Sequence, residues 1–239
     1  MYKIVSKKSL AHKETLFEVE APDIAAKAKP GQFLIVVPNE KGERIPLTIS
    51  GYDTNKGTVS FAFHQVGKTT KALGCLKEGD TLMNVTGPLG NPSEVKKFGK
   101  VLCVGGSIMI APALLQIKAM KEAGNHVTTV LGCRSKDFLF MENEAKVLSD
   151  KVYVASDDGS IGFTGLDFLK DLLKTEKFDH CVVLGPVVMM REVSEITKPY
   201  GIPTIVTMTP IMMDGMGMCG VCRVTVAGEM KFGCIDGPE

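Results

Sequence analysis

The N-terminal part of the chain alternates short apolar runs with turn residues, a pattern typical of β-strands. Turn signals stand at Pro30-Gly31 and at Asn55-Lys56-Gly57. Strands are expected at Tyr2–Ser6, Thr15–Glu20, Gln32–Val37, Thr58–Gln65 and Thr81–Val85, with one short helix at Thr69–Leu76. Closely spaced short strands of this kind predict an antiparallel barrel or sandwich.

Beyond Lys100 the pattern changes to apolar runs that alternate with helical periodicity. In the segment Ala111–Lys121 the apolar residues recur at helical spacing, Pro112 suits a first helical turn and Gly124 suits a C-terminal cap. Further helical patterns lie at Leu166–Leu173 and Val187–Glu195. The apolar runs are Val101–Val104, Val127–Leu131, Val152–Ala155, Cys181–Leu184 and Thr204–Thr207. This alternation predicts an open parallel sheet, so the expected fold class is β plus α/β.

Two stretches mark the expected boundaries between these parts. Gly87–Pro92 is rich in Gly and Pro and is expected to end regular structure, and the charged stretch Ser93–Lys100 is expected to connect two domains. The tail Met208–Glu239 is too short to build a core of its own, so a metal or a disulfide is expected to hold it. The expected domains are residues 1–98, 99–208 and 209–239.

Composition excludes several functional classes. The chain has 28 Lys and Arg against 27 Asp and Glu, so no overall basic charge attracts nucleic acid or anionic lipid. The uncharged stretch Val101–Ile117 is interrupted by two glycines and a proline, and it is not expected to span a membrane. The cysteine count is odd, at 7, and no leader-like segment precedes the first strand. These features indicate a reducing cytoplasm rather than a secreted disulfide framework.

The sharpest chemical signal is the tail spacing Asp214-x4-Cys219-x2-Cys222-x11-Cys234. Plant-type 2Fe–2S ferredoxins use Cys-x4-Cys-x2-Cys and a distant fourth cysteine, so this is that spacing with a carboxylate in the first position. Interleaved glycines allow the tight turns that several ligands from one short loop require. Tetrahedral zinc and a surface loop with chance cysteines are the alternative interpretations.

Three Gly-containing loops follow expected strands of the parallel sheet. They are Gly105-Gly106, Asp157–Gly165 and Gly185-Pro186. Open α/β sheets bind ligands at the carboxyl edge of their strands, where backbone N–H groups can face a pyrophosphate. Together the loops predict a dinucleotide crevice, although each alone is equally typical of a plain strand-to-helix turn.

The barrel half carries a possible anion site. Arg44 could bind a phosphate through two hydrogen bonds, and Thr69 and Thr70 stand at the start of the expected short helix. The ordinary interpretation is a solvated charge for Arg44 and a packed side chain for His64.

Taken together, these motifs resemble the flavin, iron–sulfur electron-transfer subunits of the ferredoxin–NADP reductase superfamily, and the resemblance covers essentially the whole chain. It implies an FAD-binding barrel at residues 1–98, an NAD(P)-binding domain at 99–208 and a 2Fe–2S lobe at 209–239. The implied FAD contacts are Arg44, Pro46, Leu47, Thr48, Ser50, His64, Gln65, Val66, Thr69 and Thr70. The implied NAD(H) contacts are Gly105, Gly106, Arg134, Asp157, Gly159, Gly185 and Pro186. The implied cluster ligands are Asp214, Cys219, Cys222 and Cys234.

The resemblance also implies a function and a partner. In this family electrons pass between NAD(H), FAD and the cluster, and a larger flavoprotein and iron–sulfur subunit completes the complex. Hydride transfer requires no acid–base side chain, so no catalytic residue is expected. The aspartate at position 214 favours the branch that performs bifurcating ferredoxin:NADP oxidoreduction, because subunits of dihydroorotate dehydrogenase B carry cysteine there.

Several alternatives stay open at this point. A dihydroorotate dehydrogenase B subunit is the main alternative, followed by a hydrogenase-linked diaphorase subunit, a stand-alone NAD(P)H oxidoreductase and a zinc-binding adaptor. The preference for NAD or NADP is also open. The methionines Met212, Met213, Met216 and Met218 are expected either to contact the partner or to shield the cluster from water. Family members usually continue beyond the motif Cys234–Glu239, where this sequence ends.

Overall fold

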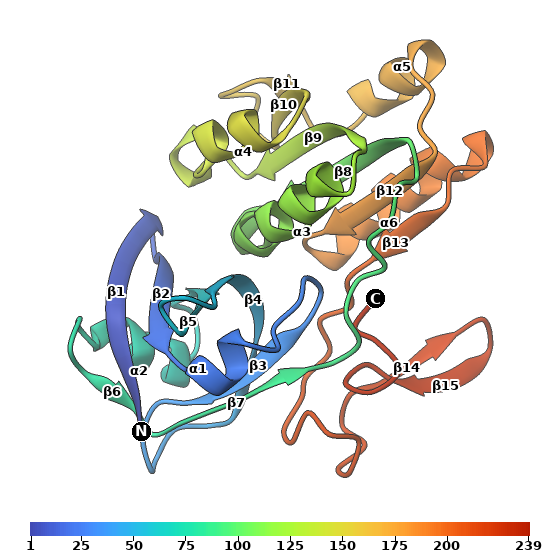
Figure 1. Cartoon of the computed structure of the whole chain (residues 1–239). Coiled ribbons are helices and arrows are strands. Elements are labelled where there is room, and N and C mark those ends of the chain that lie inside the picture. Colours follow the sequence, from blue (N-terminus) through green and yellow to red (C-terminus); the bar gives the residue numbers. More distant parts are fainter. The chain divides into compact units, whose positions relative to one another are not determined.

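The computed structural model describes residues 1–239, which form two compact units (Figure 1). The barrel unit comprises Met1–Ser93 together with Met208–Glu239, and the sheet unit comprises Glu94–Thr207. The C-terminal tail therefore shares a compact unit with the N-terminal strands.

The barrel unit is built on a seven-stranded antiparallel sheet that closes into a near-complete barrel, with strand order β6-β1-β2-β5-β4-β3-β7. The strands are β1 (Tyr2–Ala11), β2 (Glu14–Glu20), β3 (Phe33–Val37), β4 (Ile45–Asp53), β5 (Thr58–His64), β6 (Thr81–Leu82) and β7 (Asn84–Leu89). Two helices, α1 (Pro22–Ala25) and α2 (Lys68–Cys75), complete it. The predicted antiparallel barrel is confirmed.

The stretch Gly87–Pro92 was expected to end regular structure, and this prediction is wrong for its first residues. β7 continues to Leu89 and pairs with β3, with a register shift between Phe33 and Ile35. Pro88 has no N–H to donate, which an edge strand tolerates, and the register shift accommodates the Gly-Pro pair.

Buried side chains of β2 and β5 build the barrel core. Phe17, Phe61 and Phe63 are fully or almost fully buried, and their rings meet edge-on or tilted. Strand β3 differs, because all five of its residues are buried. Phe33 and Ile35 pack against Met212, Cys222 and Cys234 of the C-terminal segment. A strand covered on both faces is a continuous apolar run, which explains the sequence Phe-Leu-Ile-Val-Val.

Glu14 gives the barrel unit an expected pH dependence. Its side chain is only 1% exposed, its Oε2 atom has no hydrogen-bond partner, and burial raises its pKa from 4.5 to about 7. The folded chain therefore holds this proton more tightly than the unfolded chain, so stability is greatest below the unfolded pKa and falls as pH rises toward the folded value. Urea unfolding should show stability falling between about pH 5 and about pH 7. Glu14→Gln should flatten that slope, and an unchanged slope would contradict the assignment.

The sheet unit is a parallel sheet with strand order β11-β10-β9-β8-β12-β13. The strands are β8 (Lys100–Gly106), β9 (His126–Cys133), β10 (Lys151–Ser156), β11 (Phe163–Thr164), β12 (His180–Leu184) and β13 (Thr204–Val206). The helices are α3 (Ile110–Glu122), α4 (Glu142–Leu148), α5 (Phe168–Thr175) and α6 (Val187–Thr197). α3 contacts α4, whereas α5 contacts α6 and packs with it on Leu102, Val104 and Val183. The predicted parallel sheet is confirmed, and none of its helices is long and apolar enough to cross a membrane.

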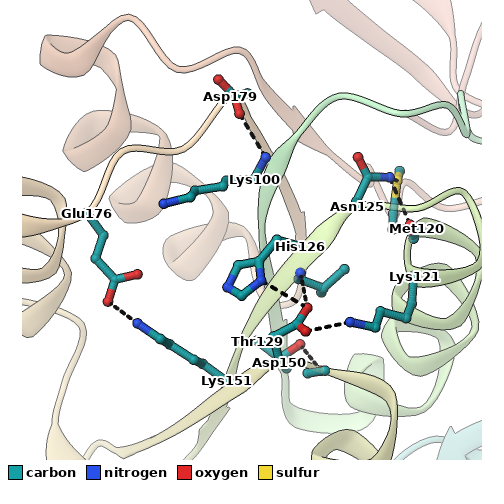
Figure 2. Close-up of polar contacts among 12 residues, drawn as sticks. Lys100, Met120, Lys121, Asn125, His126, Thr129, Asp150, Lys151, Glu176 and Asp179 are labelled. Atoms are coloured by element: carbon teal, nitrogen blue, oxygen red, sulfur yellow. Dashed lines mark hydrogen bonds and ion pairs between the residues drawn. The ribbon is translucent and has the colours of Figure 1, made fainter.

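A cluster of polar side chains lies at the edge of the sheet where β9 and β10 begin (Figure 2). The carboxylate of Asp150 accepts hydrogen bonds from the Val127 N–H at 2.8 Å and from Lys121 Nζ at 2.5 Å, and His126 Nδ1 lies 3.4 Å away. The hydrogen bond from Lys121 is the main reason that the pKa of Asp150 lies below its usual value.

Asp150→Asn should therefore destabilise the sheet unit by about 1 kcal/mol near neutral pH, because the amide keeps an acceptor but loses the charge. A carboxyl whose pKa is lowered by folding stabilises above its unfolded pKa, and this contribution disappears as pH falls through the folded value. The difference between variant and wild type in urea unfolding should therefore shrink as the pH is lowered below the ordinary range of aspartate carboxyl groups. A difference that persists there would show that the charge is not responsible.

Candidate functional site

A cavity of about 150 Å³ lies wholly within the barrel unit, between its strands and the C-terminal segment. Strands β3 and β4 contribute Phe33, Pro46 and Thr48. The C-terminal segment contributes Met208, Thr209, Pro210, Met212 and Pro238. Two residues of the Arg44–Ser50 motif thus line the cavity. The tail residues were missed, because nothing in the local pattern indicates that Met208–Glu239 returns to β3.

The other barrel residues predicted to contact a ligand have specific internal partners. Gln65 donates through Nε2 to the Thr15 hydroxyl at 2.9 Å. Thr70 Oγ1 accepts the Val66 N–H at 3.1 Å and the Gly67 N–H at 3.0 Å, so it caps the start of α2. Thr69 is buried, and its hydroxyl donates to Glu43 Oε2 at 3.2 Å. These contacts order the turn between β5 and α2.

A second cavity, of about 210 Å³, lies at the carboxyl ends of the strands of the sheet unit. Of the residues predicted for this crevice, Arg134, Asp157 and Pro186 line it. The remaining lining residues are Ser107, Gly132, Cys133, Ala155, Ser156, Gly165, Leu166, Val188, Met189 and Glu192. Gly132, Cys133, Ala155 and Ser156 are the last residues of β9 and β10, so the strand boundaries were the signal that could have identified them. Val188, Met189 and Glu192 belong to α6.

Glycines shape this cavity by leaving room for one side chain. A Cβ atom at Gly106 or Gly185 would collide with Met189, which belongs to α6 and lines the cavity. A Cβ at Gly105 would lie 2.9 Å from the Ala113 methyl of α3. The predicted glycines therefore bring the strand ends and helices together rather than lining the cavity with their own atoms.

Backbone hydrogen bonds join the loops at this edge. The Asp157 N–H donates to the Cys133 carbonyl at 3.0 Å, and the Asp158 N–H donates to the Arg134 carbonyl at 3.3 Å. Hydrogen bonds from the Ser160 hydroxyl and N–H hold the pKa of Asp158 below its usual value. Gly159 lies in this turn at a φ of +71°. These backbone hydrogen bonds thus join the loop that carries Arg134 to the loop that carries Asp157, and both residues line the cavity.

The predicted cluster ligands lie in the C-terminal segment, which contains a hairpin of β14 (Arg223–Val226) and β15 (Glu229–Phe232) before Cys234. Cys222 and Cys234 are each 2% exposed, and their Sγ atoms are 3.2 Å apart. Desolvation raises the pKa of the Cys234 thiol to about 11. Cys219 is exposed, and Asp214 accepts the N–H groups of Met216 at 2.9 Å and Cys219 at 2.7 Å.

These residues fit an iron–sulfur cluster by their chemistry and order. Three thiols and a carboxylate lie on one short segment, two of the thiols already touch, and the Met216 N–H lowers the pKa of Asp214 so that this carboxylate is ionised. The side chains do not converge on one point, since no group of three or more His, Cys, Asp or Glu is gathered closely enough to hold a metal ion. Gly215, Gly217 and Gly220 all have positive φ.

The tail and the whole chain both match known proteins. Residues 209–239 match the model of the iron–sulfur cluster binding domain of dihydroorotate dehydrogenase B. A Thermotoga maritima protein, a homologue of the dihydroorotate dehydrogenase B (NAD(+)) electron transfer subunit, is 47% identical over 99% of this chain and 84% of its own length. A probable electron transfer subunit of the same enzyme from Methanocaldococcus jannaschii is 38% identical over 88% of this chain and 78% of its own length.

Structural similarity points to the same family. A solved structure of an NADH-dependent reduced ferredoxin–NADP oxidoreductase, described in relation to flavin-based electron bifurcation, superimposes with a TM-score of 0.94. It is 46% identical, and the match covers 100% of this chain and 87% of that one. With the barrel, the parallel sheet and the cysteine-bearing tail all present in one chain, the protein belongs to the family of dihydroorotate dehydrogenase B electron transfer subunits and their homologues.

Proposed function

We propose that this protein moves electrons between NAD(H), FAD and a 2Fe–2S cluster as the smaller subunit of a ferredoxin:NADP oxidoreductase. The observation that carries the proposal is the match over the whole chain, at 46% identity, to the NADH-dependent reduced ferredoxin–NADP oxidoreductase structure. A larger flavoprotein and iron–sulfur subunit is the proposed partner. The aspartate at position 214 supports this branch of the family over dihydroorotate dehydrogenase B.

We assign FAD binding to the barrel unit. Pro46 and Thr48 line its cavity with Met208, Thr209 and Met212. Leu47, Ser50, His64, Gln65, Val66, Thr69 and Thr70 complete the proposed flavin-binding set. The largely apolar cavity would exclude water from the flavin ring, and the Thr70 hydroxyl orders the turn before α2 beside which the rest of the cofactor would lie.

NAD(H) binding is assigned to the cavity of the sheet unit. Arg134 offers a cation to the pyrophosphate, and Asp157 accepts hydrogen bonds from ribose hydroxyls. The glycines at positions 105, 106, 159 and 185, together with Pro186, shape the strand ends beside it. Because hydride transfer needs no proton from the protein, these residues bind and orient rather than act as acids or bases.

Cluster binding is assigned to Asp214, Cys219, Cys222 and Cys234. When bound, the flavin and the cluster supply the change from two-electron hydride chemistry to one-electron transfer. The apolar residues Phe33, Ile35 and Met212 exclude water from Cys222 and Cys234. The cytoplasm is the proposed compartment, because none of the seven cysteines forms a disulfide.

A second candidate is the electron transfer subunit of dihydroorotate dehydrogenase B. The observation that favours it is the family model that matches residues 209–239. Pull-down of the full chain from its native cells distinguishes the two. The first candidate predicts a larger subunit that reduces NADP, and the second predicts a dihydroorotate-oxidising subunit.

Anaerobic purification with spectroscopy tests the proposed function. Chemical analysis should give one FAD and two irons per chain, and the oxidised protein should show flavin and iron–sulfur absorption. Dithionite should produce the EPR signal of a reduced 2Fe–2S cluster, and NADH should bleach the flavin. A colourless protein containing zinc would overturn the proposal.

A further inference from the structure

Arg44 makes a contact that flavin binding does not explain. Its Nε atom donates a hydrogen bond of 2.8 Å to the backbone carbonyl of Met213, which lies 169 residues further along the chain. Arg44 stands directly before β4, two residues from the cavity-lining Pro46. Met213 stands directly before Asp214, the proposed first ligand. The hydrogen bond thus joins the start of β4, called the flavin strand because it carries the cavity-lining Pro46 and Thr48, to the start of the sulfur-rich loop, Met212–Cys222.

The same part of the loop is fixed from the inside. Met212 is 4% exposed, lines the flavin cavity, and packs with Cys222 and Cys234. The backbone at Gly215 lies so close to β3 and β7 that a Cβ atom there would be 2.8 Å from Leu89 Cδ1 and 3.0 Å from Ile35 Cγ1. Packing therefore fixes Met212 and Gly215, on either side of Asp214. The hydrogen bond from Arg44 fixes the backbone at Met213.

The residue before Arg44, Glu43, is tied to helix α2. The Glu43 N–H donates to Thr69 Oγ1 at 3.3 Å, and the Thr69 hydroxyl donates to the Glu43 carboxylate at 3.2 Å. Thr69 belongs to α2. Residues 43 and 44 therefore connect the turn before α2, the start of β4 and the sulfur-rich loop. Because a guanidinium is planar and its donors are fixed in direction, the contact defines the orientation of the Met213 carbonyl.

We infer that Arg44 is a positioning residue for the cluster: it anchors the backbone at Met213 and so sets the position of the Asp214 carboxylate relative to the flavin strand. This inference rests on the proposed function for the identity of the bound cluster. The role differs from direct binding of a flavin phosphate, which the sequence motif suggests for the same arginine. The two roles predict different losses when the side chain is removed.

Arg44→Met and Arg44→Lys in the full chain test the inference, with Arg191→Met as a control. Arg191 is exposed on α6 and pairs only with Glu195 in the same helix. Arg191→Met therefore removes the same charge as Arg44→Met without touching the sulfur-rich loop. Arg44→Met should keep its FAD, shift the midpoint potential of the cluster and change its EPR line shape. Arg44→Lys should restore part of the wild-type signature, because an ammonium can donate to the same carbonyl. Arg191→Met should leave both properties unchanged.

Hydrogen exchange adds a measurement that does not require the cluster. In both cluster-loaded and chelator-treated protein, amides 214–219 should exchange about tenfold faster in Arg44→Met, because a hydrogen bond from a charged donor contributes that much to closing a loop. Loss of FAD with unchanged exchange would overturn the inference and assign Arg44 to the flavin. Unchanged exchange, potential and EPR signal would also overturn it. A wild-type protein that binds no iron would overturn the proposed function, and the exchange measurement would still decide the role of Arg44.

Discussion

Cys222→Ala is expected to abolish the iron–sulfur cluster while leaving FAD bound. Cys222 is buried, and its sulfur touches that of Cys234, so no exposed residue can take its place as a ligand. Loss of one thiolate leaves the iron with an incomplete set of soft donors. The iron content should fall to background, and the EPR signal should disappear. The flavin spectrum should persist, because Pro46 and Thr48 lie on β4, which contributes no side chain to the buried cluster around Cys222.

Cys75→Ala is the matched control for this experiment. Cys75 is a free and exposed thiol at the end of α2, in the same compact unit but outside the C-terminal segment. Both variants remove one thiol, so only a ligand role separates them. Cys75→Ala should retain full iron and flavin content. Loss of FAD together with iron in Cys222→Ala would show that the two sites cannot be separated.

The elements of the fold that could be predicted are those with a strong local period. The helix Val187–Glu195 agrees with α6, and the buried run Cys181–Leu184 falls within β12, because each carries its own apolar pattern. Helix α4, Glu142–Leu148, was missed, since its only buried residue is Ala145 and it presents almost no apolar stripe. The β14–β15 hairpin was missed for the same reason, because its residues are mostly exposed.

The candidate sites were predictable to different extents. Cysteine spacing needs no tertiary information, and it indicated Cys222 and Cys234, which the structure brings together. By contrast, Thr209 and Met212 line the flavin cavity only because the tail returns to β3, and no local pattern encodes that return. The contact of Arg44 with Met213 spans 169 residues and is likewise a property of the fold.

Gly162→Ala is expected to weaken NADH binding by more than about tenfold and to destabilise the sheet unit. Gly162 has a φ of +63°, and a Cβ atom there would overlap the carbonyl group of Val154 in β10. Backbone cannot give way as a flexible side chain can. The Ser156 hydroxyl holds the neighbouring Ile161 through its N–H at 3.1 Å and its carbonyl at 2.8 Å. The displaced turn would carry β11 away from β10 and open the cavity wall at Gly165 and Leu166.

Gly201→Ala is the control that separates the effect of the collision at Gly162 from the effect of a strained backbone angle. Gly201 has a φ of +65° in the same unit, and a Cβ atom there would meet nothing within 4 Å. Gly201→Ala should lower the free energy of unfolding by only the strain of a left-handed backbone at alanine, about 1–2 kcal/mol, and should leave NADH binding intact. Gly162→Ala should lower the free energy of unfolding by about 1–3 kcal/mol more than Gly201→Ala, because the collision with β10 adds to the same backbone strain. Urea unfolding and NADH titration of the flavin absorbance measure both effects. Equal destabilisation of the two variants would show that the turn is not pressed against β10 in solution.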